Sequence, residues 1–364
     1  MAAGWGRELD ALMASVRPRF GRAEPRRHAE TYVRGLLSDL ARKNAWTFAA
    51  LAGARDPTSM QRMLNAARWD TDGVRDDVRR WVVHRFGDWN RGTLVVDEVR
   101  FPKVGSSSVG VHRLFTPGSL RAVDAQVAVF LTYLSPRGRV LVDRELYLPA
   151  EWLADRARIR RLGVPDDVTF ADPDELAIRM LERTFDAHGR TAWVVAGESL
   201  TAGGRLRAWL QERGQPHVLR VAAETVVPIR GGAHVEAGRL ADAVPAPAWI
   251  RVDRGSTHAA SDERWAVIRP TGSPSATEHV LLIRRTSTPP TRPRFYECRP
   301  STGVRLFELV RAARAETAVQ DAVRWANENI GLDHYQVRRY DAWYRHMTLC
   351  LLAGAVVATG GLEP

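Results

Sequence analysis

The spacing of apolar residues changes abruptly at Thr93, and this change restricts the chain to a small set of folds. Before it, from about Ala29 to Phe86, apolar residues recur at the spacing of helix faces. After it come short β-rich runs separated by Gly, Pro and Ser, at 94–96, 109–111, 126–133 and 140–148. Helices at about 151–161, 174–188 and 205–213 then alternate with strands at 192–195 and 217–221. Consecutive strands followed by this alternation predict an α/β protein with a mixed sheet and helices on its faces.

The last third of the chain contains a β-rich segment followed by a helical one. Residues from about 224 to 297 are rich in Pro, Gly, Thr and β-branched side chains, and the clearest strand there is 279–285. A helical pattern returns from Arg305 to about Asn327, and the apolar run 349–359 is too short to span a bilayer, which predicts a buried C-terminal helix. We therefore expect four parts: an N-terminal all-helical domain (1–91) that is a candidate for DNA binding or assembly, the first part of an α/β core (92–223), a β-rich insertion (224–300) and a C-terminal helical part of the core (301–364).

The charge points to a polyanionic partner. The 364-residue chain carries a net charge of +11, and Lys43 and Lys103 are its only lysines. Arginine binds phosphate through two parallel donors and stays charged, which favours DNA. A GC-rich genome would explain the preference for arginine over lysine, but not the net excess.

The cysteine content and the N-terminus indicate a cytoplasmic protein, associated with the nucleoid if it binds DNA. Cys298 and Cys350 are too few for a disulfide framework or a zinc site. The N-terminus lacks the charged and then apolar pattern of a signal peptide, and we expect no membrane partner.

Three short segments carry the candidate chemistry. Asp97 ends the apolar run 94–96, Gly197 and Glu198 follow the buried strand 192–195, and Gln320 and Asp321 lie in the helical pattern before Gly331. If the second strand continues, Gly197 and Glu198 point to opposite faces of the sheet. Asp321 lies about 100° around the helix from Gln320 and should project elsewhere.

These segments, with others along nearly the whole chain, resemble the actinobacterial insertion-sequence transposases of the DDE superfamily endonucleases. The resemblance is carried by residues 22–27, 32–37, 43–46, 67–70, 94–98, 101–103, 108–111, 126–131, 146–149, 151–152, 193–198, 331–338 and 343–346. It implies a ribonuclease H-like core and phosphodiester cleavage and strand transfer at two Mg²⁺ ions. Magnesium prefers hard oxygen ligands, which the family supplies as two Asp and one Glu from distant parts of the chain.

The resemblance also implies that this triad is degenerate. Asp97 matches the first Asp, whereas Gly197 stands at the position of the second Asp and Gln320 at that of the Glu. Asn327 replaces the family's usual Lys, and the stretch 257–265, with His258 and Ser261, has lost a family Lys-Gly and Arg motif. Asp97 alone is a weak metal ligand, so we expect Mg²⁺ to bind weakly or not at all.

The residues expected to contact DNA are basic side chains of helices and of the family-like segments. They are Arg75, Arg79, Arg80, Lys103, Arg338 and Arg345. The first three form the polar face of a helix whose other face is apolar, and such a face is solvated or contacts phosphate.

The main hypothesis is a transposase-derived DNA-binding pseudoenzyme whose nuclease activity is lost or impaired. Three alternatives stay open. One is an active Mg²⁺-dependent transposase in which Asp97, Glu198 and Asp321 form a displaced triad. Another is an enzyme that uses the emptied metal cleft on a small molecule through Asp97, His112, Glu198 and Gln320, with His112 lying beside Asp97 in the sheet. The third is a decayed product with no role. Because family members act in assemblies on paired DNA ends, we also expect self-association.

Overall fold

A twisted mixed sheet of ten strands runs through the part of the chain that the computed structural model describes, residues 5–115, 122–228, 233–252, 263–269, 279–286 and 292–360. Its order is β2-β3-β1-β5-β6-β12-β11-β10-β9, with β4 also paired to β3, and β7 and β8 form a small second sheet. The strands are β1 (Thr93–Pro102), β2 (His112–Phe115), β3 (Ala122–Ser135), β4 (Gly138–Leu146), β5 (Trp193–Ala196), β6 (His217–Val221), β7 (Val226–Pro228), β8 (His234–Glu236), β9 (Ile250–Arg251), β10 (Glu263–Ile268), β11 (Val280–Thr286) and β12 (Arg294–Arg299).

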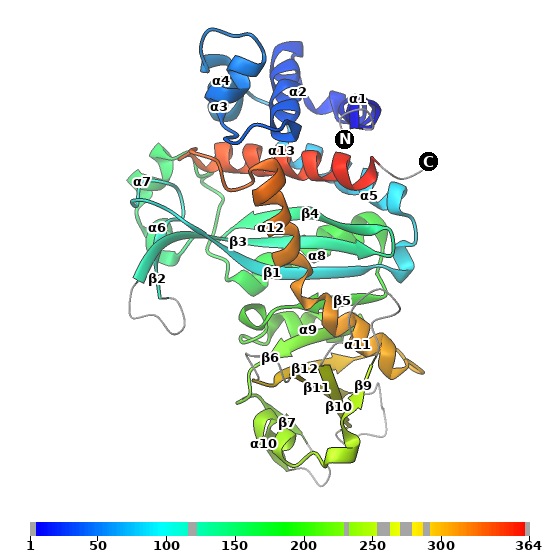
Figure 1. Cartoon of the computed structure of the whole chain (residues 1–364). Helices are drawn as coiled ribbons and strands as arrows, with labels where there is room; N and C mark the ends of the chain where they lie inside the picture. Colours follow the sequence, from blue (N-terminus) through cyan, green and yellow to red (C-terminus); the bar gives the residue numbers. More distant parts are fainter. Residues whose placement is uncertain are drawn as a thin grey trace.

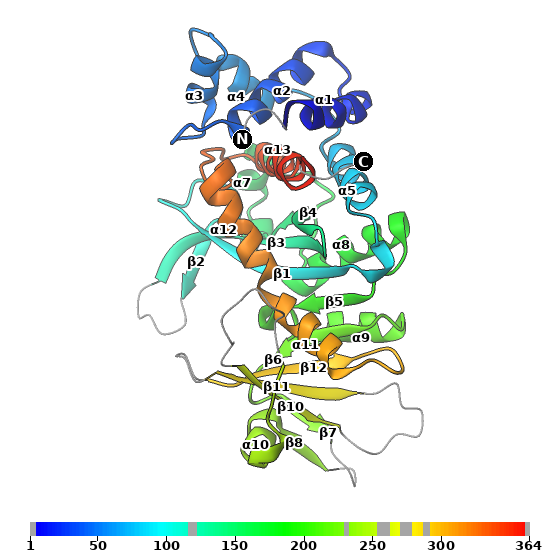
Figure 2. The same cartoon turned by 45° about the vertical axis from the view of Figure 1, so that its right-hand side comes forward.

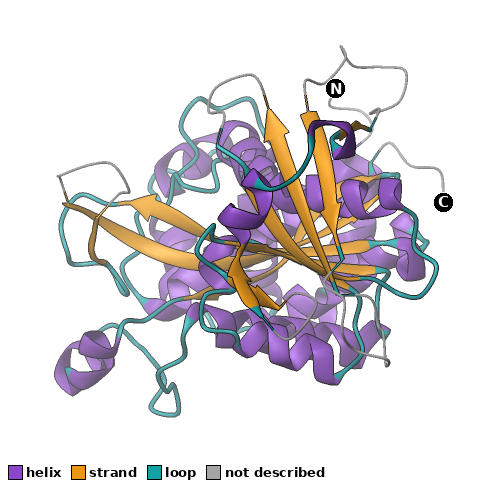
Figure 3. Ribbon diagram, turned by 90° about the horizontal axis from the view of Figure 1, so that it is seen from below, coloured by secondary structure: helices purple, strands orange, loops and turns teal. Residues whose placement is uncertain are grey.

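Helices surround this sheet, which crosses the middle of the molecule in Figure 3. They are α1 (Trp5–Ser15), α2 (Ala23–Leu37), α3 (Ala45–Leu51), α4 (Thr58–Asn65), α5 (Thr71–Phe86), α6 (Ala150–Ala154), α7 (Arg156–Arg161), α8 (Pro173–His188), α9 (Arg205–Glu212), α10 (Ala237–Asp242), α11 (Leu306–Arg314), α12 (Ala318–Ile330) and α13 (Tyr340–Thr359). Short 3₁₀ turns include η3 (Glu198–Leu200), which follows β5, and η5 (Ala315–Thr317), which joins α11 to α12.

The central five strands have the order β4-β3-β1-β5-β6. The pairs β4–β3 and β3–β1 are antiparallel, whereas β1–β5 and β5–β6 are parallel. This arrangement is that of a ribonuclease H-like core, and the predicted fold class is confirmed. Leu94, Val95 and Val96 of β1 are all buried, as expected for a central strand that helices cover on both faces. Those helices are α12 and α8, which cross the same strands on opposite sides (Figure 1).

The N-terminal helices share the core of the sheet through α13. This helix lies between the sheet and α1, α2 and α4, and it also packs along α5 and β4 (Figure 1). Fourteen of its 20 residues are buried because it is covered on several sides. One hydrophobic cluster therefore runs from Leu9 in α1 to Val356 in α13. Among the described helices, none is both long enough and apolar enough to cross a membrane.

The predicted insertion continues the main sheet. Strand β12 pairs antiparallel with β6, and β11, β10 and β9 follow outward (Figure 2). A small separate cluster around Val221, Ala237 and Phe295 packs α10 against these strands. His258 and Ser261 lie outside the described residues.

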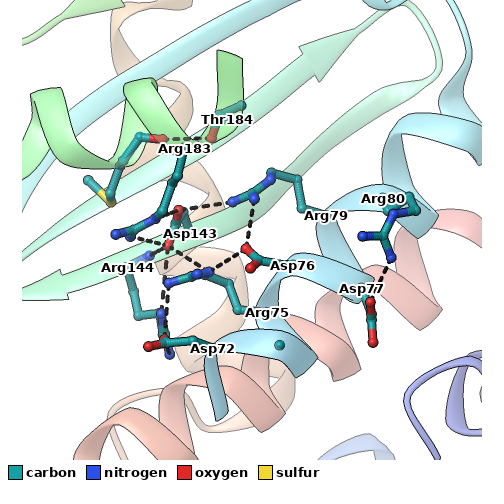
Figure 4. A network of polar contacts seen from close by, with 12 residues as sticks. Asp72, Arg75, Asp76, Asp77, Arg79, Arg80, Asp143, Arg144, Arg183 and Thr184 are labelled. Carbon is teal, nitrogen blue, oxygen red and sulfur yellow. Dashed lines mark hydrogen bonds and ion pairs between the residues drawn. The ribbon is translucent and has the colours of Figure 1, made fainter. Parts of the chain in front are cut away.

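Two of the three arginines on the polar face of α5 are buried, which corrects the expectation that this face is solvated or contacts phosphate (Figure 4). Arg75 and Arg79 are 6% and 2% exposed. Arg79 donates to Asp143 of β4, and Arg183 of α8 donates to both oxygens of the same carboxylate at 2.7 Å. These guanidinium groups hold the pKa of the fully buried Asp143 well below its usual range, although desolvation opposes them. Arg75 and Arg79 therefore join α5 to the sheet and present no surface to DNA.

Candidate functional site

The carboxyl ends of β1 and β5 place Asp97 beside Gly197. The two strands pair in parallel from Thr93–Trp193 to Val96–Ala196, and the Gly197 N–H donates to the Val96 carbonyl at 3.3 Å. Asp97 and Gly197 follow directly after the paired residues Val96 and Ala196, so they lie side by side in the same register. In a parallel pair, residues in register project to the same face, and the ends of such strands are a common place for functional groups.

The Asp97 carboxylate fills the space that a side chain at position 197 would need. A Cβ atom on Gly197 would lie 2.2 Å from Asp97 Oδ1, far inside van der Waals contact. Any larger residue at 197 would force Asp97 to move. The structure thus brings these two predicted site positions into direct contact.

Helix α12 brings Gln320 to the same point, where it passes β1 (Figure 2). Gln320 Nε2 donates to Asp97 Oδ2 at 3.0 Å and to the Glu98 carbonyl at 2.9 Å. Both partners only accept hydrogen bonds, so the NH₂ end of the amide must face them. A glutamate at this position would place oxygen against oxygen, and a proton or a metal ion would be needed between them.

The half-buried Asp97 is held toward its neutral form. Desolvation raises its pKa from 3.8 to about 6, and the nearby carboxylates of Glu316 and Glu98 act in the same direction. The hydrogen bonds from Gln320 and from the Glu98 N–H, 2.9 Å from Asp97 Oδ1, oppose this rise.

An ion-pair network around the buried Glu316, which was not predicted from the sequence, lies next to Asp97. Glu316 of η5 accepts hydrogen bonds from Arg220 of β6, from Arg294 and from Tyr296 of β12. Arg220 also pairs with Glu198 at 3.2 Å, so Glu198 turns toward this arginine. Glu316 precedes Gln320 by four residues, and that spacing was a usable signal because it puts both on one face of a helix.

Two other candidates lie away from Asp97. The Asp321 carboxylate accepts from Thr317 at 3.1 Å and pairs with Arg139 of β4 at 3.3 Å, in agreement with its position around the helix. His112 pairs with Ala125 on the opposite edge of β3 from β1, whereas Asp97 pairs with Phe130. Five residues along a strand span about 17 Å, so the expectation that His112 lies beside Asp97 is wrong.

The remaining basic candidates differ in exposure. Arg345 is buried, donates to the Leu64 carbonyl and pairs with Asp341, which leaves it unsuitable as a surface contact for phosphate. The half-buried Lys103 amine lies 3.4 Å from the centre of the Tyr335 ring, and desolvation lowers its pKa to about 8. Arg338 is exposed, and so is Arg80, which pairs with Asp77.

The donor set does not fit a pair of Mg²⁺ ions. Asp97 supplies one carboxylate, Gly197 supplies no side chain, and Gln320 supplies an amide whose NH₂ group faces Asp97. Mg²⁺ instead requires several oxygen ligands in octahedral geometry. Across the described ranges, no group of three or more His, Cys, Asp or Glu side chains is arranged to hold a metal ion.

The strand order and the acidic residue at the end of β1 define a nuclease scaffold of the ribonuclease H-like class. The chain belongs to the DDE superfamily endonucleases, whose family model matches residues 15–246. It therefore has a transposase-like origin, in a family that acts on DNA and generally uses a divalent metal such as Mg²⁺. The match includes Asp97 and Gly197 and ends before η5 and α12. A comparison with curated proteins gives no significant match.

Proposed function

We propose that this chain is a DNA-binding protein derived from a DDE insertion-sequence transposase, and that it no longer cuts or joins DNA. The observation that carries the proposal is the contact between Gln320 and Asp97. The amide donates to the carboxylate and to the Glu98 carbonyl, where the family's Glu would share a metal ion with Asp97.

The lack of a carboxylate at position 197 independently supports the proposed loss of DNA cleavage. Gly197 offers no ligand, and the Asp97 carboxylate fills the space that a side chain at this position would need. Neither Glu198 nor Asp321 replaces it, because the first pairs with Arg220 and the second with Arg139. The three members of the alternative triad, Asp97, Glu198 and Asp321, thus each contact different partners.

DNA binding is supported by the family and by the charge. The chain has eleven more basic than acidic residues. It keeps this charge although Gly197 and Gln320 stand where the family has two of its three metal-binding carboxylates. In the cell such a protein would associate with the nucleoid. Self-association stays a prediction.

The test combines a binding assay with a cleavage assay on the purified full-length protein. We expect a labelled DNA duplex to bind with an affinity that falls steeply with salt, because phosphate contacts release counterions. We expect supercoiled plasmid to stay intact in Mg²⁺ or Mn²⁺, at the level of the Asp97→Ala variant. Metal-dependent nicking that Asp97→Ala abolishes would show that the protein is an active nuclease. Absence of DNA binding at low salt would remove the other half of the proposal.

A further inference from the structure

An open groove lies at the outer end of the N-terminal helices, between the start of α2 and α4. It encloses about 870 Å³ and is lined by Arg22 before α2, by Arg55 before α4, and by Arg62 and Arg68 within and after α4. Figure 1 shows these helices at the end of the molecule opposite β7 and α10. The groove is therefore remote from Asp97 and separate from the candidate active site.

The four arginines are exposed, and none of them has a hydrogen-bond or ion-pair acceptor within the described ranges. The arginines of the α5–β4 network, in contrast, are paired with the Asp143 carboxylate. Two carboxylates also line the groove, Glu24 at 3.6 Å from His28 and Asp56, which accepts from the Thr58 N–H at 2.8 Å, and the four arginines outnumber them. The charge that the groove offers to a ligand is positive.

The charge is also unevenly distributed along the chain. Residues 1–69 contain twelve basic and six acidic side chains, so this first fifth of the chain carries more than half of the net charge of +11. A basic concavity of this kind attracts a polyanion over long distances. A membrane surface is a poorer fit, because it is bound by convex amphipathic helices that insert apolar residues.

The groove is built on well-anchored elements. Met60, Met63 and Leu64 bury the inner face of α4, and Ala29, Tyr32 and Val33 bury that of α2. The α2 N-terminus adds partial positive charge at the same side. Arg62 lies within α4 and Arg22 is the N-cap residue of α2, so the backbone at these two positions is already ordered before a phosphate binds.

We propose that this groove binds the phosphate backbone of duplex DNA. The inference rests on the proposed function and assigns the contact to Arg22, Arg55, Arg62 and Arg68. It replaces Arg75, Arg79 and Arg345, which the fold buries.

The test measures binding of a labelled DNA duplex by fluorescence anisotropy over a range of salt concentrations. The Arg55→Ala/Arg62→Ala variant should weaken binding and reduce the slope of log Kd against log salt by about 2, since each phosphate contact contributes about 0.9 to this slope. The Arg55→Lys/Arg62→Lys variant should keep most of the slope. The matched control is Arg156→Ala/Arg161→Ala on α7, which removes the same charge from two exposed arginines and should leave the slope unchanged.

The outcomes separate the two proposals. If the wild-type protein binds no DNA, the proposed function fails. If it binds DNA and the groove and α7 variants lose the same slope, binding is diffuse and the groove assignment is wrong. If the groove variant binds like the wild type, the contact lies elsewhere and the assignment is also wrong. Exposed Arg→Ala changes cost little stability, and equal thermal unfolding midpoints for all variants would show that each is folded.

Discussion

Replacing Gln320 by glutamate should convert the amide contact into a repulsive one. The new carboxylate would face Asp97 Oδ2 and the Glu98 carbonyl, which now accept from Gln320 at 3.0 and 2.9 Å. Two hydrogen bonds are lost, at about 1 kcal/mol each. Two carboxylates about 4 Å apart repel by roughly 4 kcal/mol at an effective dielectric constant of 20. Because residue 320 is exposed and can rotate toward solvent, we expect a net loss of about 2 kcal/mol in the free energy of unfolding.

The same variant should become sensitive to divalent cations. Adjacent carboxylates bind Mn²⁺ or Mg²⁺, and a ligand that binds only the folded state at 100 times its Kd stabilises it by about 2.7 kcal/mol. Adding Gly197→Asp should strengthen this response by supplying a further carboxylate, once Asp97 has moved aside. The wild-type protein should show little stabilisation by either ion.

Urea denaturation at pH 7 to 8, with and without MnCl₂, measures both effects. Gln320→Ala is the matched control, because it removes the donors without adding a charge. A Gln320→Glu variant that is no less stable than Gln320→Ala and is not stabilised by Mn²⁺ would contradict both expectations. Strong stabilisation of the wild-type protein by Mn²⁺ would equally contradict the proposed loss of the metal site.

Three further predictions concern buried ionisable groups. Asp143→Asn leaves Arg79 and Arg183 without their shared carboxylate and should cost 3–5 kcal/mol, a range typical of broken buried pairs, in urea denaturation. Asp97 has a folded-state pKa raised from 3.8 to about 6, so its contribution to stability should fall as the pH rises from 4 to 6. Asp97→Asn should abolish that slope, and an unchanged profile would contradict the assignment. Desolvation lowers the pKa of the buried His346 from 6.5 to about 4, so its contribution to stability should decrease as the pH falls from 6.5 to 4, opposite in sign to that of Asp97, and His346→Gln should remove this loss in acid.

The core of the fold could be predicted because its signals are local. The helix expected at 174–188 is α8 (Pro173–His188), and the strand expected at 192–195 is β5 (Trp193–Ala196). Apolar periodicity and flanking turn residues lie within a few positions of each other, so a single segment contains the information. The continuation of the sheet through β12 to β9 had no such signal, because pairing between β6 and β12 joins residues far apart in the chain.

The exposure of charged side chains could not be predicted in the same way. An amphipathic pattern identifies the apolar face of α5 but does not show whether another element covers the opposite face. Arg75 and Arg79 are buried because Asp143 of β4 lies against them, 64 residues from Arg79. The neighbouring sequence does not distinguish these buried arginines from the exposed arginines that line the groove, such as Arg55 and Arg62.

The type and order of most elements in the central core, the family, and the lack of a carboxylate at residues 197 and 320 could all be read from the sequence. The consequence of these changes depends on the folded structure, since the amide of Gln320 contacts Asp97, which lies 223 residues away in the chain. Composition and periodicity are properties of neighbouring residues. Hydrogen bonding, desolvation and the pKa of Asp97 depend on which distant atoms the fold brings within about 3 Å.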